Sequence, residues 1–171
     1  MPLSMYQASI PVFVKALTNL KAVLEKGAAY AQAKKIDESV LLEARLYPDM
    51  LTLTEQVQIA ADMARGGAIR LTGGEPESWP DNEKTFAELY ARIDRTIAYL
   101  KEFSAERFDG SETRQVTRKL RGELRTFTGA NYLQQFVVPN LYFHSTVAYA
   151  ILRHNGVDVG KLDFLGRLDF S

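Results

Sequence analysis

Four long segments of this chain carry apolar residues every three or four positions, the spacing of one face of an α-helix. The segments cover residues 4–33, 52–71, 82–103 and 128–155. A water-soluble protein buries such faces against other helices, so the pattern predicts an all-α fold organised as a four-helix bundle. The 171 residues suffice for one domain with its own core, and we expect a single domain over residues 1–171.

Local signals indicate where the first and last helices begin and end. Ser4 and Gln7 have the spacing of a capping box, and Pro11 should start or kink the first helix. Thr128 caps the last helical region, which Pro139 either bends or divides and Gly156 terminates.

Three shorter segments connect the long helices. Residues 37–45 predict a short helix, and residues 75–80 predict a loop. Between residues 113 and 128 the apolar period changes from 3.6 towards two, with Arg121 and Gly122 in the middle. This change predicts a small β-hairpin directly before the last helix.

The second helix has an unusual interior, because Gly66 and Gly67 follow one another among several alanines. Each glycine inside a helix costs about 1 kcal/mol relative to alanine. Either another helix approaches closely at this point, or the glycine pair marks a kink.

Composition excludes several classes of function. The formal net charge is zero, whereas nucleic-acid binders usually carry a basic excess. The absence of cysteine excludes thiolate nucleophiles and cysteine-ligated metals. No apolar stretch reaches the ~20 residues of a membrane span, and the N-terminus does not resemble a secretory signal. We therefore expect a cytoplasmic protein with no nucleic-acid or membrane partner, and the lack of net charge mildly favours self-association.

The chain has two histidines, and helical phase separates them. His144 shares the stripe of Leu141 and Ala148, whereas His154 points to the opposite, solvated side. His144 is the ionisable group expected inside the bundle. It is either a buried neutral imidazole in a core hydrogen bond or a ligand or catalytic group.

Polar residues elsewhere have plain structural interpretations. Asp62 and Arg65 can pair on a face of the second helix that also carries Gln58, and this face is either solvated or covered by a second subunit. Residues 81–83 are expected to cap the third helix. The basic side chains of residues 114–125 fit a solvated strand face, and no phosphate-binding loop, GxSxG elbow or HExxH pair is present.

Several motifs together resemble a known bacterial family. They are Ala44-Arg-Leu46, Pro48-Asp-Met50, Gln56-Val-Gln58-Ile-Ala60 with Asp62, Asp81-Asn-Glu83, Pro139 to Gly156, and Gly160 to Gly166. In these motifs the chain is similar to the domain of unknown function 1993 family, which in turn is similar to the DinB/YfiT-like four-helix bundles. The resemblance implies that fold and frequent homodimers, but no established activity.

Many members of the wider DinB-like group hold a divalent metal with three histidines, one on the second helix and an HxxxH pair on the last. Here His144 can supply the first member of that pair, but Ala148 stands at the second position and the second helix has no histidine. A rescued site would need an oxygen ligand such as Asp62 or Gln58 beside His144, but helical phase places Asp62 on the wrong side of the second helix.

Three hypotheses follow from these residues. The first is a dimeric bundle that is non-catalytic or has a degenerate metal site. The second is a metal-dependent transferase or hydrolase, and the third is a module that binds a small molecule around His144. A divalent metal is the one cofactor that these residues leave open, and none is expected otherwise. The candidate pocket residues are His144, Asn140, Tyr142, Tyr149, Gln58 and Asp62.

Overall fold

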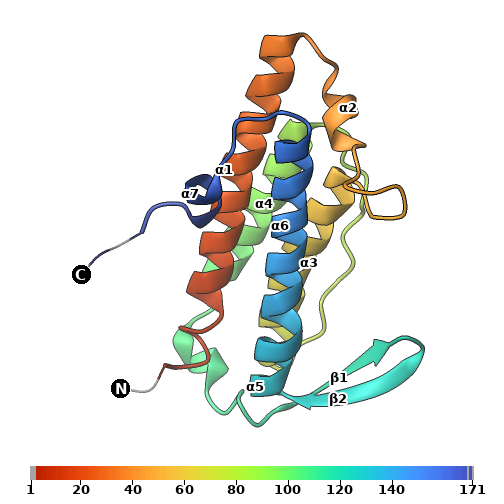
Figure 1. The fold of residues 1–171 in the computed structure, drawn as a ribbon. Coiled ribbons are helices and arrows are strands. Elements are labelled where there is room, and N and C mark those ends of the chain that lie inside the picture. The colour runs from red at the N-terminus through yellow and green to blue at the C-terminus, as the bar shows by residue number, and fades with distance from the viewer. Residues whose placement is uncertain (1–2, 169, 171) are drawn as a thin grey trace.

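Four long helices form the body of the protein in the computed structural model, which describes residues 3–168 and 170 (Figure 1). They are α1 (Ile10–Lys34), α3 (Leu53–Leu71), α4 (Phe86–Lys101) and α6 (Val138–His154). Short elements join them: α2 (Glu38–Leu42), η1 (Ala105–Phe108), β1 (Gln115–Leu120), β2 (Glu123–Thr128), α5 (Gly129–Asn131), the π-helical η2 (Tyr132–Val137) and α7 (Lys161–Leu165). The predicted all-α bundle with one hairpin before the last helix is confirmed.

The core lies where the predicted apolar stripes meet. Helix α3 packs against α6 and α4, and α1 packs against α4 and α6. Leu17, Val57, Leu89, Ile93 and Leu141 are completely buried between these helices. Burial of such side chains contributes about 1.5–3 kcal/mol each, so the bundle interface is the main source of stability.

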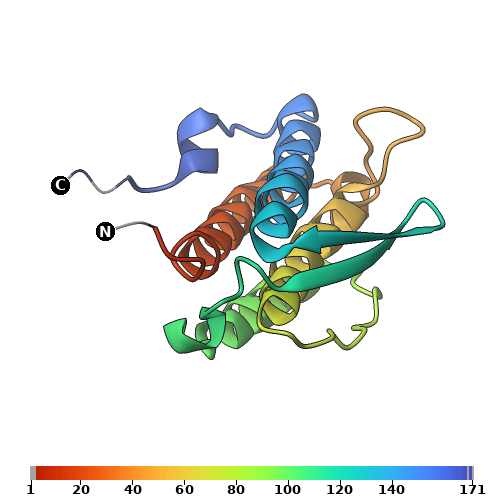
Figure 2. The ribbon, with the colours of Figure 1, turned by 90° about the horizontal axis from the view of Figure 1, so that it is seen from below.

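The hairpin projects from the lower end of the bundle in Figure 1, and the view from below shows that it extends away from the side of α7 (Figure 2). Strands β1 and β2 pair antiparallel, with Val116 opposite Phe127. Arg121 and Gly122 both have positive φ at the turn (50° and 87°), which matches the right-handed twist of the strands.

Helix α1 starts later than the sequence predicts. The capping box at Ser4 and Gln7 does form, with the Gln7 amide donating to Ser4 Oγ (3.1 Å). It closes only a turn, and the regular helix begins at Ile10, with Pro11 in its first turn. The predicted start at residue 4 is therefore wrong, whereas the helix start at Pro11 is confirmed, because proline is tolerated where no amide hydrogen is needed.

Helix α4 also starts later than expected, and residues 81–83 do not cap it. Its N-cap is Thr85, whose hydroxyl accepts from the Glu88 amide (3.1 Å) while the Glu88 carboxylate accepts from the Thr85 amide (3.1 Å). This reciprocal pair satisfies two backbone donors at once. Residues 81–83 instead belong to the loop of residues 72–85, which runs along α3 and α4.

The glycine pair of α3 permits close helix packing and causes no kink that interrupts the helix. A Cβ atom on Gly67 would lie 2.6 Å from Val137 Cγ1 of η2. The last helical region likewise continues from residue 129 to residue 154 without a break. The π-helical turns of η2 come directly before Pro139, so the predicted disturbance takes the form of a local widening of the helix.

Candidate functional site

His144 of α6 contacts Gln56 of α3 across the interface between the two helices. The distance from His144 Nδ1 to Gln56 Oε1 is 2.7 Å. Gln56 is 2% exposed, whereas the imidazole is half-buried. The prediction from helical phase that His144 faces the inside of the bundle is thus confirmed, and His154 is exposed as predicted.

A second hydrogen bond fixes the protonation of this imidazole. Gln56 Nε2 donates to the Leu51 carbonyl oxygen (3.3 Å), which can only accept. The amide oxygen of Gln56 therefore faces His144, and the imidazole must donate through Nδ1. The lone pair of His144 is consequently on Nε2, which has no hydrogen-bond partner among residues 3–168 and 170.

Burial sets the charge of the imidazole. It lowers the pKa of His144 below its usual value of 6.5, because the charged form loses hydration. The ring is therefore neutral at neutral pH. A neutral imidazole with a fixed tautomer can accept a proton or a cation at Nε2.

The residues around His144 do not fit the three-histidine metal centre of the wider DinB-like group. The α3 residue that faces the ring is an amide, Gln56, and Ala148 one turn further along α6 is completely buried. Within the part of the chain that the structure describes, no group of three or more histidine, aspartate or glutamate side chains could hold a metal ion.

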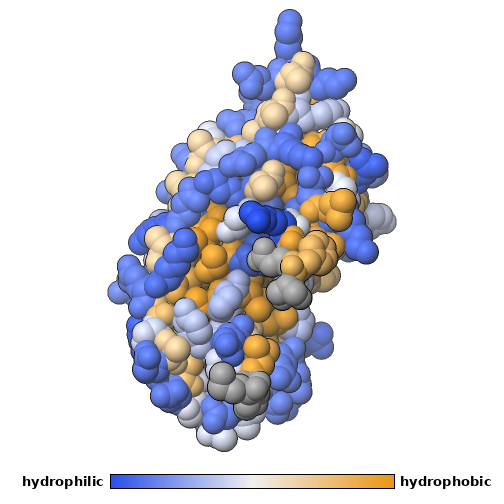
Figure 3. All heavy atoms as spheres, turned by 90° about the vertical axis from the view of Figure 1, so that its left-hand side faces the viewer, coloured by the Kyte–Doolittle hydropathy of each residue, from blue (hydrophilic) through white to orange (hydrophobic). Residues whose placement is uncertain are grey.

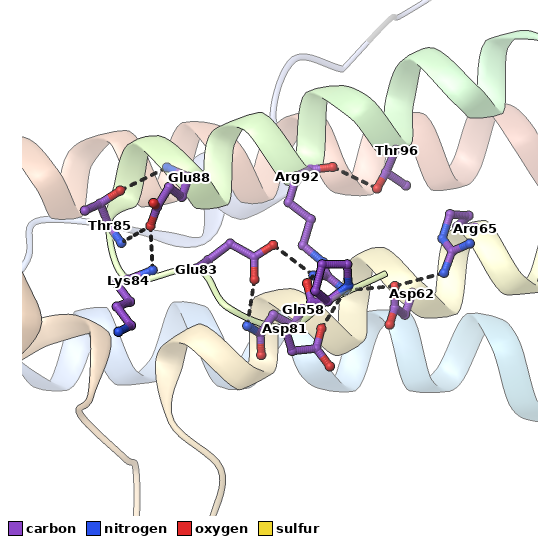
Figure 4. A network of polar contacts seen from close by, with 11 residues as sticks. Gln58, Asp62, Arg65, Asp81, Glu83, Lys84, Thr85, Glu88, Arg92 and Thr96 are labelled. Carbon is purple, nitrogen blue, oxygen red and sulfur yellow. Dashed lines mark hydrogen bonds and ion pairs between the residues drawn. The ribbon is translucent and has the colours of Figure 1, made fainter. Parts of the chain in front are cut away.

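Gln58 and Asp62 lie on a different side of α3, in a polar network with the 72–85 loop and α4 (Figure 4). Gln58 Nε2 donates to Glu83 (2.8 Å), and Asp62 Oδ1 accepts from Arg92 (3.0 Å). These two candidate residues are therefore not neighbours of His144. The loop and α4 of the same chain cover this face, so neither a fully solvated face nor a second subunit is needed to explain it.

Arg92 is the centre of that network. It is 4% exposed and contacts Asp62, Asp81 (2.8 Å) and Glu83 (2.9 Å). Burial alone raises the pKa of Glu83, but hydrogen bonds from Arg92 and Gln58 outweigh it and hold that pKa below its usual value. Because the carboxylates come from α3 and from the loop, Arg92 fastens the loop to the bundle.

Trp79 fastens the same loop by a second contact. Its ring lies between two guanidinium groups, with Arg65 at 4.1 Å and Arg95 at 3.7 Å from the ring centroid. Such cation–π contacts hold an aromatic ring in place at a polar surface. Together with Arg92 they explain why a long loop without regular structure follows α3 and α4 closely.

The remaining candidates lie elsewhere again. Tyr142 and Tyr149 pack against Phe164 of α7, with ring centroids 6.5 and 6.0 Å away. Asn140 Nδ2 donates to the Phe136 carbonyl oxygen of its own helical region (2.6 Å). The six candidate pocket residues therefore do not form one pocket, and His144 is the one among them that contacts Gln56.

Sequence reasoning missed Gln56, Arg92 and Ser145. Each of them is a polar residue at a position that continues an apolar stripe, and each is less than 5% exposed. A polar side chain within a buried stripe needs a partner, so this signal was present in the sequence. The identity of the partner depends on how the helices are aligned, which spacing along one helix does not give.

Comparison with known proteins identifies the family of the chain and supports its fold. The family described as Domain of unknown function (DUF1993) matches residues 5–165. A crystal structure of a DinB family member from Shewanella denitrificans has a TM-score of 0.91 and 43% identity, over 98% of this chain and 94% of that chain. No curated protein matches the chain.

One further observation concerns membranes. Over residues 3–168 and 170, no helix combines the length and the apolar character that crossing a bilayer requires.

The match to residues 5–165 and the solved relative show that the chain belongs to the DUF1993 family of DinB-like helical proteins.

Proposed function

We propose that this protein is a non-catalytic, homodimeric binding protein whose DinB-type metal centre has degenerated into the His144–Gln56 hydrogen bond. One observation supports it most directly: the α3 side chain that meets the imidazole, at 2.7 Å, is the amide of Gln56 and not a second histidine. On the same face of α6, Ala148 presents a methyl group that cannot bind a metal where the wider group has its second histidine.

Metal titration of the untagged protein tests the degenerate centre. We expect calorimetry with Zn²⁺, Ni²⁺ and Mn²⁺ to give no stoichiometric binding, and elemental analysis of purified protein to find none of them at one ion per chain. Wild type and His144→Ala should behave alike in both measurements. One equivalent of bound metal that disappears in His144→Ala, but persists in His154→Ala, would overturn the proposal.

Exposed apolar side chains beside the His144–Gln56 pair support the dimer. Leu51, whose carbonyl accepts from Gln56, is 37% exposed, and Phe143, whose ring meets His144 edge-on, is 56% exposed. Zero net charge leaves little repulsion between copies. A second copy of this chain is the occupant that we propose for this face.

A metal-dependent transferase or hydrolase is the second candidate, and one observation favours it. The Nε2 lone pair of His144 has no partner within the described part of the chain, as a ligand or a general base requires. The metal titration above separates the two candidates, because an enzyme of this type binds its ion through that atom.

A further inference from the structure

A small cavity lies between α1, α6 and α7, away from the His144–Gln56 pair. Its volume is about 210 Å³. Leu20 of α1 and Phe164 and Leu165 of α7 supply apolar walls. In Figure 3, which looks onto the side of α1 and α7, hydrophobic residues gather in the middle of the face and hydrophilic ones surround them.

Ser145 lines this cavity with a hydroxyl that lacks a partner. The residue is 2% exposed, and its Oγ is buried without a hydrogen bond. A helical serine usually satisfies its hydroxyl by bonding to the carbonyl one turn earlier. A buried hydroxyl without any bond costs about 1–3 kcal/mol, which a bound polar group would recover.

Within the described part of the chain, the charged side chain that lines the cavity is a lysine. Lys15 lies in its wall and is exposed, and it forms no ion pair with any residue that the structure describes. Among residues 3–168 and 170, no acidic side chain lines the cavity. Tyr142 also lines the cavity, and its side chain carries a hydroxyl that can donate or accept a hydrogen bond.

Helix α7 closes the cavity and is attached to α1 by a few polar contacts. Asn19 Nδ2 donates to the carbonyl oxygens of Phe164 (3.1 Å) and Leu165 (2.9 Å), and Lys26 pairs with Asp163 (2.7 Å). Gly166 permits the close approach, because a Cβ atom there would lie 2.1 Å from Asn19 Oδ1. The amide of Asn19 is thus used to hold α7, and Lys15, Tyr142 and Ser145 are the groups left to meet a ligand.

We propose that this cavity binds a small monocarboxylic acid with an aromatic or branched apolar body. The body would lie against Leu20 and Phe164, the carboxylate would meet Lys15, and Ser145 would donate a hydrogen bond. The volume is below the 300–1,000 Å³ common for drug-sized ligands, so the acid has about ten non-hydrogen atoms. This inference rests on the proposed binding function and adds the place and the chemistry of the ligand.

Benzoate is the probe that tests the inference, with benzamide as its uncharged match. In ¹H–¹⁵N spectra of the full-length protein, benzoate should shift the amide signals of residues 15–20, 142–145 and 161–168. Lys15→Met should weaken benzoate binding about tenfold or more and leave benzamide unchanged, because it removes a charge-assisted contact. Ser145→Ala should weaken both, and Lys34→Met, also on α1, should weaken neither.

Each outcome decides the inference. Shifts confined to other residues, no shift at all, or unchanged benzoate affinity in Lys15→Met would overturn it. Ser145→Ala keeps the helical propensity of α6, and its circular dichroism spectrum verifies the fold. These results leave the metal titration unaffected, so failure of this cavity and failure of the proposed degenerate centre are distinguishable.

Discussion

His144 and Gln56 are 88 positions apart in the chain, and their hydrogen bond joins α6 to α3. At the residue scale this bond determines the tautomer of the imidazole, and burial lowers its pKa. The Leu51 carbonyl orients the Gln56 amide, and the amide in turn orients the ring. The orientation of the imidazole therefore depends on two successive hydrogen bonds, from Gln56 to the Leu51 carbonyl and from His144 to Gln56.

Removing the ring should destabilise the fold. His144→Ala leaves Gln56 Oε1 buried and unpaired and opens space between α3 and α6, so we expect a loss of about 2 kcal/mol. Urea unfolding measures it. His154→Ala, at the exposed end of the same helix, should stay within about 0.5 kcal/mol of wild type. Equal stability of the two variants would contradict the buried hydrogen bond.

Stability should depend on pH through the same residue. Burial lowers the pKa of folded His144 below 6.5, so the unfolded chain takes up a proton first as pH falls. Stability is therefore complete above pH 6.5 and decreases as pH falls from 6.5 through the folded pKa. Unfolding measured from pH 7.5 to 5.5 should give a steeper loss for wild type than for His144→Gln. Parallel curves would mean that this imidazole does not titrate differently on folding.

The sequence supports part of this site. The phase of the last helix turns His144 inward, and the structure agrees. The choice of Gln56 over Gln58 as its partner depends on the alignment of two helices, and helical periodicity within one segment carries no information about that alignment. Helical phase correctly turns Asp62 away from His144, but the same limit hides its partner Arg92, which lies on another helix.

At the scale of elements, small residues determine how closely helices approach. Gly67 meets Val137, a β-branched side chain of a helix with little freedom to move. The neighbouring Gly66 instead faces the terminal nitrogen of the flexible Arg70 side chain (2.7 Å). The two glycines therefore have different roles, although they are adjacent.

This difference predicts opposite effects of the same substitution. Gly67→Ala should destabilise the protein by about 1–3 kcal/mol, because the added methyl group clashes with Val137. Gly66→Ala should be neutral or stabilising by up to about 1 kcal/mol, because Arg70 can move and alanine favours the helix. Thermal unfolding of both variants measures the effect. A loss of stability in Gly66→Ala equal to that in Gly67→Ala would contradict the close packing.

Element boundaries show where sequence signals compete. Residues 81–83 have the acidic character of a helix start, but Thr85 and Glu88 form the capping box that actually begins α4. The box was present in the sequence as a Thr-x-x-Glu spacing. Asp81 and Glu83 instead form ion pairs with the buried Arg92. The spacing of residues along the sequence does not predict these pairs.

At the scale of the whole molecule, the four apolar stripes were sufficient to predict the bundle, since four long amphipathic helices can bury their faces only together. The prediction of a dimer rests on apolar side chains that stay exposed on the surface of the single chain. Phe143 and Leu51 flank the His144–Gln56 pair at 56% and 37% exposure, whereas Leu124 is 74% exposed on the hairpin.

A charge placed on this surface should separate the copies. Light scattering after size exclusion should give the mass of a dimer for wild type and of a monomer for Phe143→Asp, because the new carboxylate would be buried without a partner. Leu124→Asp, which adds the same charge on the hairpin, should remain dimeric. A monomeric wild type at micromolar concentration would exclude the dimer.

The most direct test of the central claim is ¹⁵N NMR of the His144 imidazole, recorded before and after one equivalent of Zn²⁺. The protein should show a proton on Nδ1 and none on Nε2, with both resonances unchanged by zinc. A proton on Nε2, or an Nε2 resonance that moves in proportion to zinc and saturates at one ion per chain, would contradict the claim that a hydrogen bond has replaced the metal centre.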